Sequence, residues 1–261
     1  MEKRNLYILN TIVITLCLLS SCASQVETES KAIEIDPGVL AKTVAEAENL
    51  FKQRADIEKL RTAIAMLGKI RNPDRRNYEV EWKFARYNYF LGKQMTDESE
   101  SEKAFEIGRD AGGIASRIEA AKPEGHFWYA ANLGEMAQRS PITVGLKAVD
   151  DIRKAMNMVI SIQPDYQGAS AYDALAQLEL KTRLTGGKAE KAVELLQKGL
   201  SIEPANSNLR LHLAEAYLAI DKDAEAKKQL DTLLKMKPDP NYVVEHAQAL
   251  NEAKKLLEKK F

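Results

Sequence analysis

The stretch ANSNLRLHLAEAYLAIDKDAEAKKQLDTLLKMKP, residues 205–238, decides the fold. Small and large apolar residues recur in it at helical spacing. These positions are Leu213, Ala214, Tyr217, Ala226, Leu230 and Leu233, followed by Pro238. In two crossing helices, small residues stand where the helices approach closely, large ones fill the space beside them, and a proline ends the second helix. The stretch therefore predicts two helices paired as a hairpin.

Prolines divide the preceding part of the chain at similar intervals. Each follows an apolar helical stretch, and successive intervals are 41, 40 and 34 residues. The four prolines are Pro123, Pro164, Pro204 and Pro238. Repeats of this length are typical of stacked helical hairpins.

Residues 205–238 also resemble the tetratricopeptide repeat family. They depart from its pattern at Arg210, which stands at the tryptophan position, and at Asp221, which stands at the turn glycine. We expect an all-α solenoid of about five helix pairs in a single domain, residues 38–261. Residues 244–259 are predicted to form a charged capping helix, which the open end of a solenoid needs.

The predicted hairpins differ in the length of their loops. Long loops are expected near 93–101, 139–148 and 182–188, and the second helix of the second hairpin is expected at 102–121. Insertions in a solenoid project from one edge, so these loops could cover a groove. The alternative is tolerated surface variation, because longer loops cost little free energy.

The N-terminus carries a signal for export. Leu19-Ser20-Ser21-Cys22 looks like a bacterial lipobox, and it follows two basic residues and an apolar run over 6–19. We therefore predict a signal peptide at 1–21, lipidation of Cys22 and a flexible tether at 22–37. A membrane-spanning anchor, for which the run is short, and an ordinary secretory signal are the alternatives. Ala23 favours the periplasmic face of the outer membrane, because it is not the aspartate that retains lipoproteins at the inner membrane.

Composition and motifs argue against several classes of function. Formal charge is zero, so nucleic acid is not an expected partner. Cys17 leaves with the signal and Cys22 carries the lipid, so the mature body has no thiol. The three histidines fall in different repeats without a second ligand at helical spacing, so no metal and no cofactor are expected. A catalytic constellation is missing from the sequence, so we do not expect an enzyme.

A longer resemblance starts at Pro123. Its segments are residues 124–134, 164–166 and 186–192, the last with the double glycine Gly186-Gly187. Together they resemble the T-component lipoproteins linked to tripartite ATP-independent periplasmic (TRAP-type) transporters. The resemblance implies an all-helical periplasmic lipoprotein that works beside a solute-binding protein.

An aromatic cluster supplies the candidate binding residues. Trp128, Asn132 and Glu135 share one face of a helix, and we place them in a concave groove with the neighbouring His126. Tyr87 falls on the groove side of the preceding hairpin. The alternative for the aromatic residues is the core, where aromatic stripes at helical spacing usually lie.

The expected function is non-enzymatic binding of a partner protein by a membrane-anchored repeat domain. Two alternatives are a carrier of a small hydrophobic ligand, with the long loops as a roof, and a scaffold for envelope or cell-wall assembly. A homo-oligomer is also left open.

Overall fold

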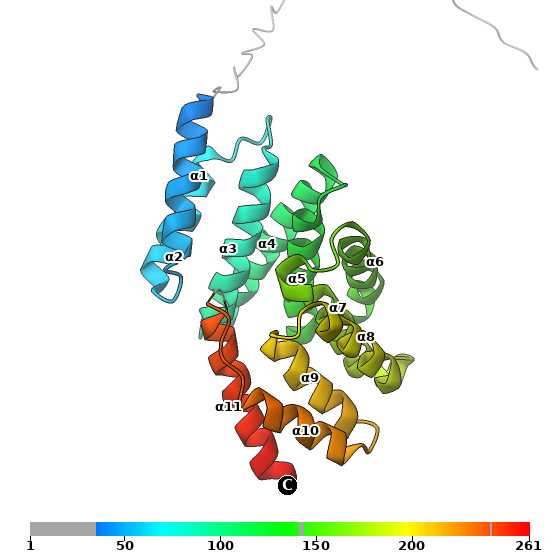
Figure 1. The fold of residues 1–261 in the computed structure, drawn as a ribbon. Coiled ribbons are helices and arrows are strands. Elements are labelled where there is room, and N and C mark those ends of the chain that lie inside the picture. Colours follow the sequence, from blue (N-terminus) through cyan, green and yellow to red (C-terminus); the bar gives the residue numbers. More distant parts are fainter. Residues whose placement is uncertain (1–34, 141–143, 241) are drawn as a thin grey trace, which may run out of the picture. The chain divides into compact units, whose positions relative to one another are not determined.

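In the part of the chain that the structure describes, five helical hairpins and a last helix follow one another (Figure 1). The structure is a computed structural model that describes residues 35–140, 144–240 and 242–261. Its helices are α1 (Pro37–Phe51) and α2 (Ile57–Ile70), α3 (Tyr78–Gln94) and α4 (Glu98–Ile118), α5 (Pro123–Arg139) and α6 (Leu146–Ile162), α7 (Tyr166–Lys181) and α8 (Ala189–Ile202), α9 (Ser207–Leu218) and α10 (Asp223–Leu233), and α11 (Val243–Lys260). The predicted all-α stack of five pairs with a capping helix is confirmed. Cys22 and the predicted signal lie outside the described residues.

Prolines separate the hairpins as the sequence indicates. Pro164 and Pro204 each stand two residues after the last residue of a second helix, and Pro238 follows α10. Pro123 is the first residue of α5, where its missing N–H leaves no hydrogen bond unmade. At the turn of the last hairpin, Asp221 has φ 57°, so it adopts the left-handed conformation that a turn glycine supplies.

The connection between α3 and α4 is shorter than predicted. The expected long loop at 93–101 and the expected helix at 102–121 are wrong, because α4 already begins at Glu98. The Asp97 side chain accepts a hydrogen bond from the Glu100 N–H, and the acidic first turn is favoured by the helix dipole. Three residues, Met95–Asp97, connect the helices, which is too few to roof a groove.

The loop at 182–188 is confirmed. It contains the short 3₁₀ helix η2 (Arg183–Thr185) and then Gly186 at φ 113°. A Cβ on Gly187 would lie 2.2 Å from the backbone oxygen of Glu179, so the double glycine allows both the turn and its close approach to α7. Residues 141–143 of the third predicted loop lie outside the described part.

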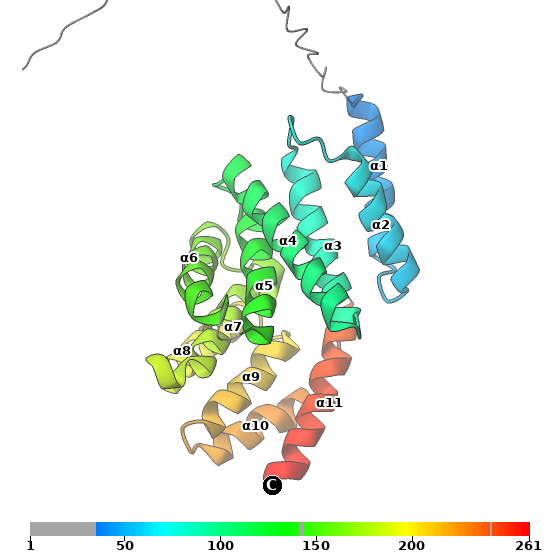
Figure 2. The same cartoon turned by 180° about the vertical axis from the view of Figure 1, so that it is seen from behind.

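Successive helices pack against one another, and the odd-numbered helices form a second set of contacts. Helix α3 packs against α5, α5 against α7, α7 against α9, and α9 against α11. The first helices of the hairpins therefore make an inner row, with the second helices outside it (Figures 1 and 2). Side chains of the inner row from different hairpins can therefore lie close to one another.

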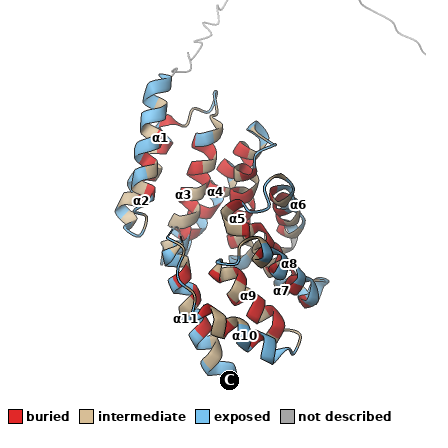
Figure 3. Cartoon of the chain, viewed as in Figure 1, coloured by how far each residue is buried: buried red, intermediate tan, exposed pale blue. Residues whose placement is uncertain are grey.

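The buried residues form two hydrophobic clusters, at the interfaces between helices (Figure 3). The first joins the first three hairpins to part of α7, and the second joins the rest of α7 to the last hairpins and α11. Backbone contact tightens the first cluster. A Cβ on Gly112 of α4 would lie 2.5 Å from the backbone nitrogen of Tyr129, and one on Gly125 would lie 2.4 Å from that of Ser116.

A charged network joins the first two hairpins. Glu48 of α1 accepts hydrogen bonds from Lys83 at 2.7 Å, Arg86 at 2.5 Å and the Tyr87 hydroxyl at 2.9 Å. Burial alone would raise the pKa of Glu48, but the charges and hydrogen bonds of Arg86 and Lys83 lower it from 4.5 to about 2. The ionised carboxylate therefore stabilises the folded state.

We expect this carboxylate to make stability depend on pH. A folded-state pKa below the unfolded value contributes stability above pH 4.5 that is lost as the pH falls towards 2. The shift corresponds to at most about 3 kcal/mol, of which about 2 kcal/mol should be lost between pH 5 and pH 3. Urea unfolding of the wild-type chain and of Glu48→Gln across this range measures it. The variant should show a shallower decline, and parallel pH curves would contradict the assignment.

Candidate functional site

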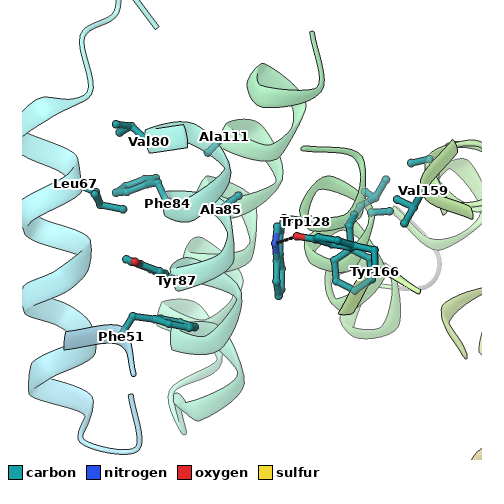
Figure 4. Close-up of a cluster of buried hydrophobic side chains, with 14 of the residues drawn as sticks. Phe51, Leu67, Val80, Phe84, Ala85, Tyr87, Ala111, Trp128, Val159 and Tyr166 are labelled. Atoms are coloured by element: carbon teal, nitrogen blue, oxygen red, sulfur yellow. Dashed lines mark hydrogen bonds between the residues drawn. The ribbon is translucent and has the colours of Figure 1, made fainter. Parts of the chain in front are cut away.

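Two of the predicted groove side chains, Tyr87 and Trp128, lie in the core (Figure 4). The ring of Tyr87 is fully buried and stacks on Phe51 at 4.4 Å between centroids. Trp128 is 3% exposed, and its indole N–H donates to the Tyr166 hydroxyl at 3.2 Å. The prediction that these two side chains are exposed in a groove is therefore wrong. They belong to the core, which was the alternative for the aromatic residues.

Asn132 is also buried, between three helices. Its amide nitrogen donates to the backbone oxygens of Ala85 on α3, at 3.2 Å, and of Trp128, at 2.7 Å. A Cβ on Gly108 of α4 would lie 2.3 Å from its side-chain oxygen, so Asn132 fills a place that only a glycine leaves free. The predicted shared face of α5 exists, but α3 and α4 cover it at Asn132.

Glu135 and His126 have different surroundings. Glu135, one turn after Asn132, accepts from Lys93 at 2.9 Å and from Arg139 at 2.9 Å. His126 is half-buried near the start of α5, with its Nε2 3.0 Å from the backbone oxygen of Ala120. Glu135 belongs to a group of ionisable side chains that spans several inner helices, whereas Tyr87 meets the separate Glu48 network and His126 contacts neither group.

Polar and charged side chains of four inner helices meet around Glu135. We call this set the inner-face cluster: Tyr89, Lys93, Glu135, Arg139, Asp173, Gln177, Lys181, His212 and Glu215. Beside the Glu135 ion pairs, His212 Nδ1 lies 2.6 Å from a carboxylate oxygen of Asp173 on the neighbouring helix. Asp173, Gln177 and Lys181 stand four residues apart on α7, so they share one face of that helix.

The ionisation behaviour of the cluster shows how closely its members interact. Burial raises the pKa of Tyr89, and the negative charges of Glu135 and Asp173 raise it further. Burial would lower the pKa of His212, but the charge and hydrogen bond of Asp173 outweigh it, so this pKa is raised. Charged groups on α3, α5, α7 and α9 therefore lie close enough to influence one another.

Part of the cluster is left available for a ligand. The Gln177 amide nitrogen is buried without a hydrogen-bond partner. Lys181 is exposed and, among the residues that the structure describes, it takes part in no ion pair. The buried Gln177 nitrogen gains a hydrogen bond if a bound partner brings an acceptor to it, whereas the exposed Lys181 ammonium is hydrated in the free chain and can pair with an acidic group. The inner face therefore suits a polar ligand with both charges or with main-chain groups rather than an apolar molecule.

The sequence contains a signal for this cluster that the prediction missed. Lys93, Glu135, Gln177 and Glu215 each directly follow the small residue of their inner helix. Those small residues are Gly92, Gly134, Ala176 and Ala214. Equivalent positions in successive repeats form a row across a solenoid, so repeat alignment would have found them.

The described part of the chain has neither a cluster of metal ligands nor a membrane-spanning helix. Across 35–140, 144–240 and 242–261, three or more histidine, cysteine, aspartate or glutamate side chains nowhere gather as metal ligands. In the same ranges, every helix is too short or too polar to span a bilayer.

Two family models match parts of the chain. A model described as "Regulator of microtubule dynamics protein 1-3" matches residues 43–172, and a tetratricopeptide repeat model matches residues 184–243. The search of curated proteins gave no match. The second model covers the stretch from which the fold was predicted.

Solved structures share the fold at low sequence identity. A thermophilic TPR protein of Thermus thermophilus, TTC0263, is 16% identical, with a TM-score of 0.58 over 80% of this chain and 98% of that one. MamA from residue 41 to its end, of Desulfovibrio magneticus RS-1, is 14% identical, with a TM-score of 0.51 over 73% of this chain and 92% of that one. The chain is thus a tetratricopeptide-like helical repeat protein.

Proposed function

We propose that this chain is a non-enzymatic scaffold that binds a partner protein through the inner-face cluster. The observation that carries the proposal is the cluster itself, in which four successive inner helices bring charged groups close together beside the buried, unpaired amide nitrogen of Gln177 and the exposed ammonium of Lys181. Repeats of this kind use such extended inner surfaces for binding. The mixture of charges favours a polar protein segment over a small hydrophobic ligand.

We also propose that a lipid on Cys22 holds the scaffold at the periplasmic face of the outer membrane. The lipobox and Ala23 support this location. Two or three acyl chains anchor a protein stably, because each buried CH₂ contributes about 0.8 kcal/mol. The resemblance of residues 124–134, 164–166 and 186–192 to T-component lipoproteins suggests the solute-binding protein of a TRAP-type transporter as the partner.

Reversing one charge of the cluster should remove the partner. The carboxylates of Glu135, Asp173 and Glu215 act electrostatically on Lys181, so Lys181→Glu places a negative charge close to three others. We expect at least a tenfold lower yield of the partner when the tagged full chain is isolated from detergent-solubilised membranes and its companions are identified by mass spectrometry. The matched control is Lys154→Glu, an exposed lysine on the outer helix α6, which should leave the yield unchanged.

Each part of the proposal can fail separately. Recovery of the same proteins with Lys181→Glu and Lys154→Glu would show that the inner face is not the binding surface. A partner that is lost with Lys181→Glu but is not a solute-binding protein would refute the transporter role alone. Radiolabelled palmitate should enter the wild-type chain and not Cys22→Ser, and equal labelling of the two would refute the lipid anchor.

A further inference from the structure

The two ends of the hairpin stack touch each other. Arg54, in the turn between α1 and α2, donates to Glu245 in the first turn of α11 at 3.1 Å, across 191 residues of sequence. The two side chains are 21% and 23% exposed, so the ion pair is largely withdrawn from water. In both views of the fold, the start of α11 lies beside the α3–α4 hairpin (Figures 1 and 2). We call this ion pair the clasp.

The clasp lies at the edge of the inner-face cluster. The Arg54 guanidinium stands over the rings of Phe51, at 5.0 Å, and Phe90, at 4.7 Å. Phe90 in turn contacts Tyr89 of the cluster, with 5.4 Å between ring centroids, and the pKa of Tyr89, which burial raises most, is raised further by the charges of Glu135 and Glu245. When the clasp is closed, the first turn of α11 therefore stands next to the α3 side of the cluster.

Each half of the clasp is held by its own end of the stack. Cation–π contacts with Phe51 and Phe90 position Arg54 without Glu245. On the other side, His246 is buried with its Nδ1 2.6 Å from the Ser207 hydroxyl of α9, and Ala249 and Ala253 are buried on the last hairpin. Release of the ion pair therefore leaves both ends folded.

Only one of the two carboxylate oxygens of Glu245 has a hydrogen-bond partner in the closed clasp. Glu245 Oε1 is bonded to Arg54, but its Oε2 is buried without a hydrogen-bond partner. A buried unpaired oxygen costs free energy that a hydrated carboxylate in an open state would recover, which offsets part of the free energy gained from the ion pair. Both hydrophobic clusters include residues of α7, so this helix lies between the two halves of the stack that carry Arg54 and Glu245.

We propose that the clasp gates the inner face: it closes the ends of the stack beside the cluster, and its release opens the cluster to the partner without unfolding the chain. The gating role rests on the proposed function, whereas the opening itself does not. The contact that opens and closes is the one between the first hairpin and α11. The partner binds when this contact is open.

Spin-label distances test the opening in the full chain. Cys17→Ser and Cys22→Ser remove the native thiols, and labels are placed on Lys52→Cys beside the clasp and on Gln248→Cys of α11, both exposed positions. A short distance between the two labels reports the closed clasp, and a long distance reports the open one. Arg54→Ala should raise the ratio of open to closed molecules about tenfold, because a hydrogen bond to a charged group is lost. Glu245→Gln, which keeps the size of the side chain, should raise it in the same direction.

Arg61→Ala is the matched control. It removes another arginine–glutamate pair between hairpins, Arg61 to Glu100 at 3.1 Å, which does not involve α11, and it should leave the distances unchanged. Unchanged distances in folded Arg54→Ala and Glu245→Gln would overturn the proposal. Isolation of the partner from membranes tests gating separately from opening. Arg54→Ala should raise the yield of the partner. Longer label distances with an unchanged yield of the partner would overturn gating and leave the opening intact. Lys181→Glu tests the binding surface independently of both results.

Discussion

Gly112→Ala is expected to lower the free energy of unfolding by about 3 kcal/mol or more, although alanine is the better helix former. The added Cβ would lie 2.5 Å from the backbone nitrogen of Tyr129 and 2.8 Å from its Cα. These atoms belong to helix α5 itself, so no side-chain rotation relieves the overlap. Relief requires α4 and α5 to separate, which would loosen the interface that Gly125 also tightens.

Gly134→Ala is the matched control for this substitution. Gly134 also stands inside a helix, but a Cβ there would meet nothing within 4 Å. The same chemical change should then stabilise the chain by about 1 kcal/mol through helix propensity alone. Urea unfolding followed by circular dichroism measures both variants. If the two substitutions shift stability equally, the helices do not pack backbone to backbone at Gly112.

The close packing of α4 on α5 illustrates what the sequence could and could not predict. Regular features gave the architecture, because prolines, small residues and apolar spacing recur from hairpin to hairpin and each repeat supports the interpretation of the next. The start of α4 was missed because one capping side chain, Asp97, decides it. The left-handed conformation of Gln167, Gly168 and Ala169 at the start of α7 has no repeated pattern and was also not predicted.

The candidate site was harder to predict than the fold, for a geometric reason. Helical spacing correctly puts Trp128, Asn132 and Glu135 on one face of α5. It does not say which neighbouring helix covers each turn of that face. All three are buried, but Trp128 and Asn132 pack in the core, whereas Glu135 pairs with Lys93 and Arg139 of the charged cluster. Burial depends on contacts between hairpins, which the spacing within one helix does not determine.

Trp128→Ala is expected to lower the free energy of unfolding by about 4 kcal/mol, a large effect for the truncation of one side chain. The indole contacts the rings of Phe127 at 5.0 Å, Tyr89 at 5.6 Å and Phe90 at 6.0 Å, so its loss leaves a cavity lined by aromatic rings. It also removes the donor to the buried Tyr166 hydroxyl. Trp128→Phe should lose less, because most of the apolar volume remains.

Trp82→Ala is the matched control for Trp128→Ala, since the chain has two tryptophans and Trp82 is only half-buried. Lys83 and Arg86 lie over its ring at 4.6 and 5.0 Å, and its removal should cost about 1 kcal/mol. Chemical unfolding at equal protein concentration compares the two variants. If the free energy of unfolding of Trp128→Ala equals that of Trp82→Ala, Trp128 does not lie in the core, and the predicted exposed groove would describe it instead. If Trp128→Ala is strongly destabilised, a lower yield of the partner with this variant reflects damage to the core. The binding surface is then tested only by changes at the surface, such as Lys181→Glu.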